Sequence, residues 1–361
     1  MYSNANRRAG DAAVLAGAQA PHDAAAGLAG ALAADRLPGL LCADAGASAI
    51  VRLARNAGPL RVAVVHPCDA TSLEGLLVAA TGPGGGLITP VIVAPRAKLD
   101  ALARTLRVDL TGFEIEDVPH SHAAAARAVE LVAQGAADAL MKGSLHTDEL
   151  MSAVLAPGSG LLTDKRVSHC FLVETRAYER PFIVTDAVVN IAPDLEQKQA
   201  IAQNAIDLAH ALGVAEPRVA VVCAVETVNP RMRSTIDAAA LAKMSERGQL
   251  TGALVDGPLA FDNAVSVRAA RIKGIKSPVA GHADILLVPD LEAGNMLVKQ
   301  LEFLGEAASA GLVVGARVPI ILTSRADSLA ARVNSCALAA ATVVRRGVTP
   351  ESHEQGMPDG S

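Results

Sequence analysis

Short apolar runs rich in β-branched residues recur along the chain from residue 60 onward. Segments with helical periodicity separate many of them, at 121–134, 195–212, 234–247 and 293–306. Strands that alternate with helices are typical of βαβ units, so the pattern predicts an α/β fold with mostly parallel sheets. The predicted strands are 61–66, 90–94, 113–118, 139–142, 168–174, 182–186, 219–225, 253–255, 284–289, 311–314 and 318–322.

The pattern is different at the start of the chain. Residues 1–57 are rich in Ala and Gly and contain no strand-like run, so we expect an N-terminal helical extension there. The remaining length of this 361-residue chain suits two domains better than one compact core. Pro157–Gly160 ("PGSG") is the best local candidate for a boundary between them.

Composition narrows the functional classes. The net charge of −5 argues against a nucleic-acid binder, because such proteins need a basic surface. The five cysteines are scattered and never form a CxxC pair, which favours buried thiols of a cytoplasmic protein. No uninterrupted apolar run is long enough for a membrane span, and we find no secretory signal pattern.

Two weak motifs do not predict ligand sites. The Gly-rich stretch "TGPGGGL" (81–87) lacks the P-loop spacing and precedes a strand rather than a helix. His120 and His122 form an HxH pair without a nearby acidic third ligand, so we expect no metal site.

The loop "MKGSLHTDEL" (141–150) follows a predicted strand and carries chemically useful groups. Thr147 is a candidate cap for a helix with an acidic first turn. The loop is either an ordinary strand-to-helix turn or a ligand site at the carboxyl edge of a parallel sheet. In the second case Lys142 and the backbone amides of Gly143 and Ser144 would face the ligand.

Three further polar clusters follow predicted strands. Asp186 and Asn190 either bind a ligand or satisfy turn amides, and Asn263 lies in a similar setting. Asn295 lies in the strand-to-helix turn "PDLEAGN".

The stretch "ILTSRADS" (321–328) carries the strongest candidate chemistry. Ser324 and Asp327 fit a helix capping box, with Asp in place of the usual Glu. Capping does not explain Arg325, because the helix dipole disfavours a cation in the first turn. An anion bound at the same place would explain it, since Arg forms bidentate hydrogen bonds to phosphate.

Five motifs in order, "MKGSLHT", "TDAVVNIAPDLEQK", "DGPLAFDNAVS", "GHADILLVPDLEAGN" and "VPIILTSRADS", resemble the phosphate acetyltransferase/phosphate butyryltransferase family over roughly residues 60–345. The forms "GPLAFDNAVS" and "SRADS" are more similar to its butyryl branch. The resemblance implies two α/β domains with an active-site cleft between them. It places domain I in 58–160 plus 311–350, domain II in 161–310 and a C-terminal tail in 351–361.

The resemblance also implies the reaction: acyl-CoA and inorganic phosphate exchange with acyl phosphate and CoA, for a short acyl group such as acetyl or butyryl. The family needs neither metal nor nucleotide cofactor and forms homodimers or larger homo-oligomers. Ser324 and Arg325 match its catalytic Ser-Arg pair, and Asp327 is the nearest carboxylate. The expected substrate-binding residues are Lys142, Gly143, Ser144, His146, Asp186, Asn190, Asn263, Asn295 and Arg332.

One departure keeps alternatives open. The acetyl branch has an acidic residue about two turns into the last helix, where this chain has Ala331 and Arg332. A CoA- or acyl-phosphate-binding protein with weakened catalysis is therefore one alternative. An enzyme similar to acyl-carrier-protein phosphate acyltransferases is another. A metal- and NAD-dependent decarboxylating dehydrogenase would need clustered aspartates, which we do not find in the sequence.

Overall fold

The computed structural model describes residues 50, 54, 58–82, 86–324 and 326–346. Except for the helical, buried residues Ile50 and Ala54, the predicted extension 1–57 lies outside this part of the chain. The predicted tail 351–361 also lies outside it.

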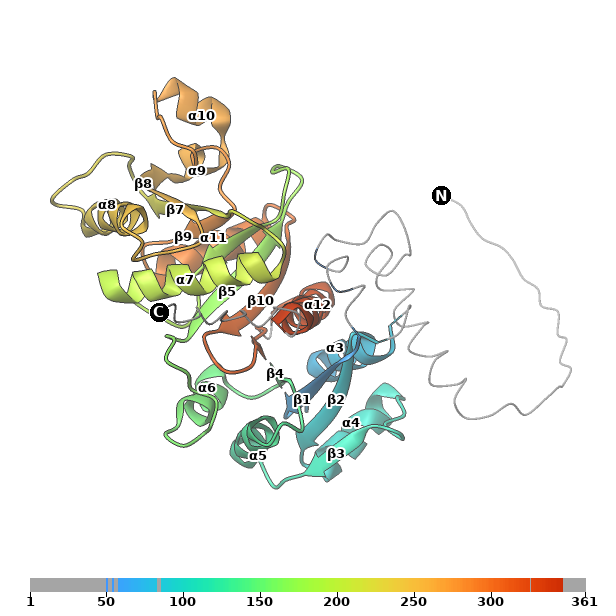
Figure 1. The fold of residues 1–361 in the computed structure, drawn as a ribbon. Coiled ribbons are helices and arrows are strands. Elements are labelled where there is room, and N and C mark those ends of the chain that lie inside the picture. The colour runs from blue at the N-terminus through green and yellow to red at the C-terminus, as the bar shows by residue number, and fades with distance from the viewer. Residues whose placement is uncertain (1–49, 51–53, 55–57, 83–85, 325, 347–361) are drawn as a thin grey trace, which may run out of the picture.

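Eleven strands form one sheet in the order β3-β2-β1-β4-β11-β10-β5-β6-β9-β7-β8 (Figure 1). Each run predicted from the sequence overlaps one of these strands, so the predicted number and order of strands are confirmed in the described part of the chain, while several ends differ by one to five residues. The strands are β1 (Leu60–Val65), β2 (Ile88–Ala94), β3 (Glu114–Asp117), β4 (Ala139–Lys142), β5 (Ser168–Glu174), β6 (Phe182–Thr185), β7 (Arg218–Cys223), β8 (Leu254–Ala260), β9 (Ile285–Leu287), β10 (Ala308–Val314) and β11 (Ile320–Ile321).

The sheet is mostly parallel, as predicted, but its centre is antiparallel. Strand β10 runs antiparallel to both β11 and β5, and β5 runs antiparallel to β6. On one side, β3, β2, β1, β4 and β11 are parallel; on the other, β6, β9, β7 and β8 are parallel. One continuous sheet thus carries both parallel groups, and the domain boundaries given above stay a prediction.

Helices cover both faces of this sheet (Figure 1). One face packs against α3, α4, α7, α8 and α12, and the other packs against α5 and α6 in the first parallel group and α9, α10 and α11 in the second. The helices are α3 (Ala70–Thr81), α4 (Arg96–Leu106), α5 (Ser121–Ala133), α6 (Thr147–Leu155), α7 (Leu195–Ala211), α8 (Arg233–Glu246), α9 (Phe261–Val265), α10 (Val267–Ile272), α11 (Leu291–Phe303) and α12 (Leu329–Arg346).

Local sequence signals explain where several helices begin and end. Asp194 and Gln197 form a reciprocal capping box at the start of α7, and Gly213 beyond its end adopts a positive φ of 92°. Asp69 accepts a hydrogen bond from the Ser72 amide and so caps α3, a helix that the apolar pattern did not predict. In the part of the chain that is described, no helix is long and apolar enough to cross a membrane.

The position of β11 determines where the site forms. This short strand lies between β4 and β10, so a segment near the end of the chain enters the middle of the sheet. Strands β1, β4 and β11 are parallel, and their carboxyl ends therefore lie at the same edge. The loop after β4 and the turn after β11 are consequently neighbours.

Candidate active site

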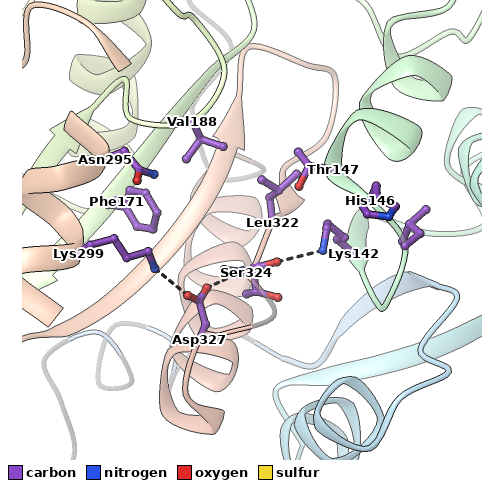
Figure 2. A pocket seen from close by; sticks show the side chains of 12 residues that line it. Lys142, His146, Thr147, Phe171, Val188, Asn295, Lys299, Leu322, Ser324 and Asp327 are labelled. Carbon is purple, nitrogen blue, oxygen red and sulfur yellow. Dashed lines mark hydrogen bonds and ion pairs between the residues drawn. The ribbon is translucent and has the colours of Figure 1, made fainter. Parts of the chain in front are cut away.

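A cavity of about 450 Å³ opens at this edge of the sheet (Figure 2). The loop after β4 and the start of α6 form one wall, and β5 and α11 contribute the opposite wall. The turn after β11 lies between them. The lining residues are Lys142, Leu145, His146, Thr147, Phe171, Val188, Asn295, Lys299, Leu322, Thr323, Ser324 and Asp327.

Lys142 is the last residue of β4 and is 4% exposed. Its ammonium group donates hydrogen bonds to the carbonyls of Gly143 (3.3 Å) and Thr323 (3.2 Å). These bonds fix the ammonium group between the β4 loop and the turn after β11. A buried cation that also lines a cavity is well placed to bind an anion, because water screens it little.

Gly143 is required by the close approach of the β1 backbone. A Cβ atom at this position would lie 2.6 Å from the His66 carbonyl oxygen and still closer to the Val65 carbonyl oxygen. The next residue, Ser144, donates from its hydroxyl to the His66 carbonyl (2.7 Å) and accepts from the Cys68 amide (3.2 Å). Gly143 and Ser144 therefore join the β4 loop to the end of β1 and do not line the cavity.

Substituting Gly143 with Ala is expected to lower the free energy of unfolding by about 1–3 kcal/mol, because backbone has to shift around the new methyl group. Urea denaturation would measure the change. Gly58→Ala is the control, since a Cβ there meets nothing within 4 Å and its effect should stay within about 0.5 kcal/mol. Equal stability of the two variants would contradict the close-approach argument.

The turn after β11 differs from the predicted capping box. Helix α12 begins at Leu329, and the Ser328 hydroxyl accepts from the Ala331 amide (3.1 Å) at its start. Ser324 and Asp327 belong to a turn that precedes the helix, where the Asp327 carboxylate accepts from the Ser324 amide (2.7 Å). The capping-box interpretation was therefore wrong in position, because the helix begins only at Leu329, after this turn.

Asp327 also forms an ion pair with Lys299 of α11 at 3.0 Å. Burial lowers the pKa of Lys299, but the hydrogen bonds to Glu302 and Asp327 outweigh it and the pKa is raised. Lys299 is thus a second cation at the cavity, facing Lys142 across Ser324 and Asp327 (Figure 2). Lys299 was not predicted as a site residue, although Asn295 and Lys299 are four residues apart and so share a face of the predicted helix.

Arg332 lies behind the turn and does not line the cavity. It is 2% exposed and donates to the Thr323 hydroxyl (2.9 Å) and the Ser324 carbonyl (2.8 Å). Burial lowers its pKa. Helix α3 leaves room for the Arg332 side chain at Gly75, where a Cβ atom would lie 2.9 Å from the Arg332 Cδ. Arg332 therefore anchors the turn that carries Ser324.

The structure brings some of the other predicted residues to the cavity. Asn295 lines it and donates to the Ala187 carbonyl (3.2 Å). His146 lines it at the N-cap position of α6, and Thr147 is the first helical residue instead of the cap. Arg325, the strongest candidate from the sequence, lies outside the described residues.

Asp186, Asn190 and Asn263 do not line this cavity. The two carboxylate oxygens of Asp186 accept hydrogen bonds from the amides of the loop after β6, the loop that ends at Asn190. The Asn190 amide group donates to Asp186 (2.6 Å) and to the Val167 carbonyl (3.0 Å). These bonds agree with the second of the two alternatives given for Asp186 and Asn190, in which the side chains satisfy the amides of the turn. Asn263 lies on α9, where it donates to Glu226 (3.3 Å).

In the described ranges, no three His, Cys, Asp or Glu side chains are grouped so that they could hold a metal ion. The two histidines of the HxH pair have other roles. His120 caps α5 by accepting from the Ala123 amide, and His122 pairs with Glu149 at 2.8 Å.

Comparison with known proteins relates this site to a family. A family model described as phosphate acetyl/butaryl transferase matches residues 106–340. A phosphate acetyltransferase of Rhizobium meliloti is 58% identical over 82% of this chain and 93% of its own length. A phosphate butyryltransferase of Clostridium acetobutylicum is 42% identical over 78% of this chain and 92% of its own.

Solved structures agree with the sequence matches. A branched-chain phosphotransacylase from Enterococcus faecalis V583 superposes with a TM-score of 0.70 at 30% identity, over 79% of this chain and 99% of that one. Among the relatives named here, the higher identity is to the acetyltransferase, whereas "GPLAFDNAVS" and "SRADS" suggested the butyryl branch. The family prediction made from the five motifs is confirmed: the chain belongs to the phosphate acetyl/butaryl transferase family of acyltransferases.

Proposed function

We propose that this protein converts a short-chain acyl-CoA and inorganic phosphate into acyl phosphate and CoA, in either direction, by direct transfer in a ternary complex. The observation that carries the proposal is the arrangement of Lys142 and Lys299 on opposite walls of one cavity, with Ser324 and Asp327 between them. Two cations and a hydroxyl around a cavity of this size fit a phosphate and the carbonyl group that it attacks.

The reaction needs negative charge to be stabilised at two places. A phosphate oxygen attacks the thioester carbonyl carbon, and the carbonyl oxygen becomes an oxyanion. The C–S bond then breaks, and the proton of the attacking phosphate ends on the CoA sulfur. We assign the phosphate to Lys142 and Arg325 and the oxyanion to the Ser324 hydroxyl, since each well-placed donor contributes about 3–4 kcal/mol in such sites.

In the reverse direction the CoA thiol has to lose its proton, because the thiolate is the nucleophile. Asp327 is the carboxylate that lines the cavity beside Ser324, and we assign it the role of proton acceptor. Its ion pair with Lys299 also holds it in place.

Direct transfer is supported by where the cysteines lie. None of the cysteines in the described part of the chain lines the cavity. Burial raises the pKa of Cys170 and of Cys336 to about 12, which makes both poor nucleophiles at neutral pH. A covalent acyl-enzyme on either thiol is therefore disfavoured.

Purified protein incubated with acetyl-CoA or butyryl-CoA is expected to release CoA only when phosphate is present, with acyl phosphate as the second product. A thiol-reactive dye and hydroxamate formation would measure the two products. CoA binding in calorimetry without phosphate-dependent release would instead indicate the binding-protein alternative. Transfer only from an acyl-carrier protein would indicate the other enzyme alternative.

Three further expectations belong to this proposal. The reaction should need no metal and no nucleotide, since the proposed charge stabilisation comes from side chains. We also expect a homodimer or larger homo-oligomer, and a cytoplasmic location.

A further inference from the structure

The cavity has an apolar wall as well as charged ones. Leu145, Phe171 and Leu322 are 3%, 7% and 6% exposed, and Val188 lies beside Phe171 (Figure 2). With the phosphate bound at Lys142, as proposed above, the hydrocarbon part of the acyl group has to lie along this wall. This step rests on the proposed function.

Phe171 is the one aromatic residue among the four apolar side chains that line the described cavity, and the bulkiest of them. It lies on β5, which is hydrogen-bonded on both sides: Phe171 is opposite Gly311 of β10 and Val184 of β6. Because both neighbouring strands hold its backbone, the ring cannot move away by a shift of the main chain. Its position depends on what its side chain packs against.

His169 packs against that ring. The two ring centroids are 4.3 Å apart at an interplanar angle of 52°. His169 is fully buried, and neither ring nitrogen makes a hydrogen bond of normal geometry within the described residues, although the Leu322 backbone lies close. Burial lowers its pKa to about 4, so the ring is neutral at neutral pH. The ring-to-ring contact thus joins the neutral, buried His169 to a residue that lines the cavity.

Gly311 provides the space for both rings. A Cβ at Gly311 would lie 2.9 Å from the Cε1 of His169 and 3.1 Å from the Cε1 of Phe171. The two rings therefore lie over the bare backbone of β10. A tight contact on that side and the histidine on the other leave Phe171 little freedom to turn out of the cavity.

We propose that Phe171 limits the acyl-chain length that this site accepts, and that His169 is a positioning residue that holds the Phe171 ring against the cavity. Longer chains would meet the ring and be excluded by overlap.

The test is a panel of acetyl-, butyryl- and hexanoyl-CoA, assayed for phosphate-dependent CoA release. Phe171→Ala is expected to raise the hexanoyl-to-acetyl ratio of kcat/KM by about tenfold or more, since a pocket discriminates each methylene by roughly this amount. Phe171→Leu should raise it less and is the milder variant if Phe171→Ala does not fold. His169→Leu should raise the ratio in the same direction but less than Phe171→Ala, while kcat for acetyl-CoA stays close to that of the parent protein.

Phe182→Leu is the matched control. Phe182 is also buried, lies on the neighbouring strand β6 in the same core cluster, and does not line the cavity. Its substitution should lower stability and leave the ratio unchanged. Phosphate-dependent acetyl transfer with the same ratio in all Phe171 variants would overturn the inference and leave the proposed function standing. No transfer from any acyl-CoA by the parent protein would overturn the proposed function itself.

Discussion

Replacing Lys142 with Met is expected to reduce kcat/KM for phosphate by about 100- to 1000-fold, because one donor to a developing anion contributes that much in preorganised sites. Met keeps the length and apolar stem of the side chain and removes only the charge and its hydrogen bonds to Gly143 and Thr323. Removing a buried ammonium that lines the cavity weakens the phosphate site and the transition state together. Steady-state kinetics with phosphate as the varied substrate would measure the loss.

The control for this substitution is Lys165→Met. Lys165 is exposed and pairs with Asp207 at 2.7 Å on a different part of the surface. Its substitution should change kcat/KM by less than about twofold, since exposed ion pairs contribute little. A Lys142→Met protein that is folded by circular dichroism and retains full activity would remove Lys142 from the site.

Asp327→Asn is expected to lower kcat by about 100-fold or more, which is the size of effect that a general base contributes. The Asn oxygen can still accept the hydrogen bond from the Ser324 amide, so the turn should persist. Lys299 keeps its second partner, Glu302, at 2.8 Å. Stability should therefore fall by only about 1 kcal/mol, measured by thermal or urea denaturation.

Glu302→Gln is the matched variant, because it removes the other carboxylate from Lys299 and leaves Asp327 in place. Its kcat should remain within a few-fold of that of the parent protein. If both variants lose rate equally, the loss of kcat comes from removing a carboxylate partner of Lys299 and not from the loss of a proton acceptor. If Asp327→Asn retains its rate, Asp327 serves the turn alone and the proton acceptor lies elsewhere.

The strands were predictable from the sequence because both faces of this sheet are covered. Strand β4 is buried along its whole length, and an apolar run bounded by polar turns is then a direct signal. Strand β11 was predicted as 318–322, although only Ile320 and Ile321 pair with their neighbours. The antiparallel centre gave no such signal, since strand direction depends on connections and not on composition.

The site was predictable in part. Lys142, Ser324 and Asp327 were found because each lies at or just after the end of a strand, and the carboxyl ends of parallel strands converge. Lys299 was missed because it enters from the middle of a helix, where a lysine is usually exposed to solvent. Arg332 was expected to bind substrate, and its contacts instead run to the backbone and hydroxyl of the turn. Those contacts depend on how α12 packs against α3, which no local pattern reveals.

The insertion of β11 between β4 and β10 has a consequence for synthesis of the chain. Domains begin to fold while the rest of the chain is still being translated. Until β11 has left the ribosome, β4 and β10 each lack one neighbour, and an unpaired strand edge invites association with other chains. The turn that follows β11 supplies Ser324 and Asp327, so a nascent chain can neither complete its sheet nor acquire its site before β11 and this turn have been made.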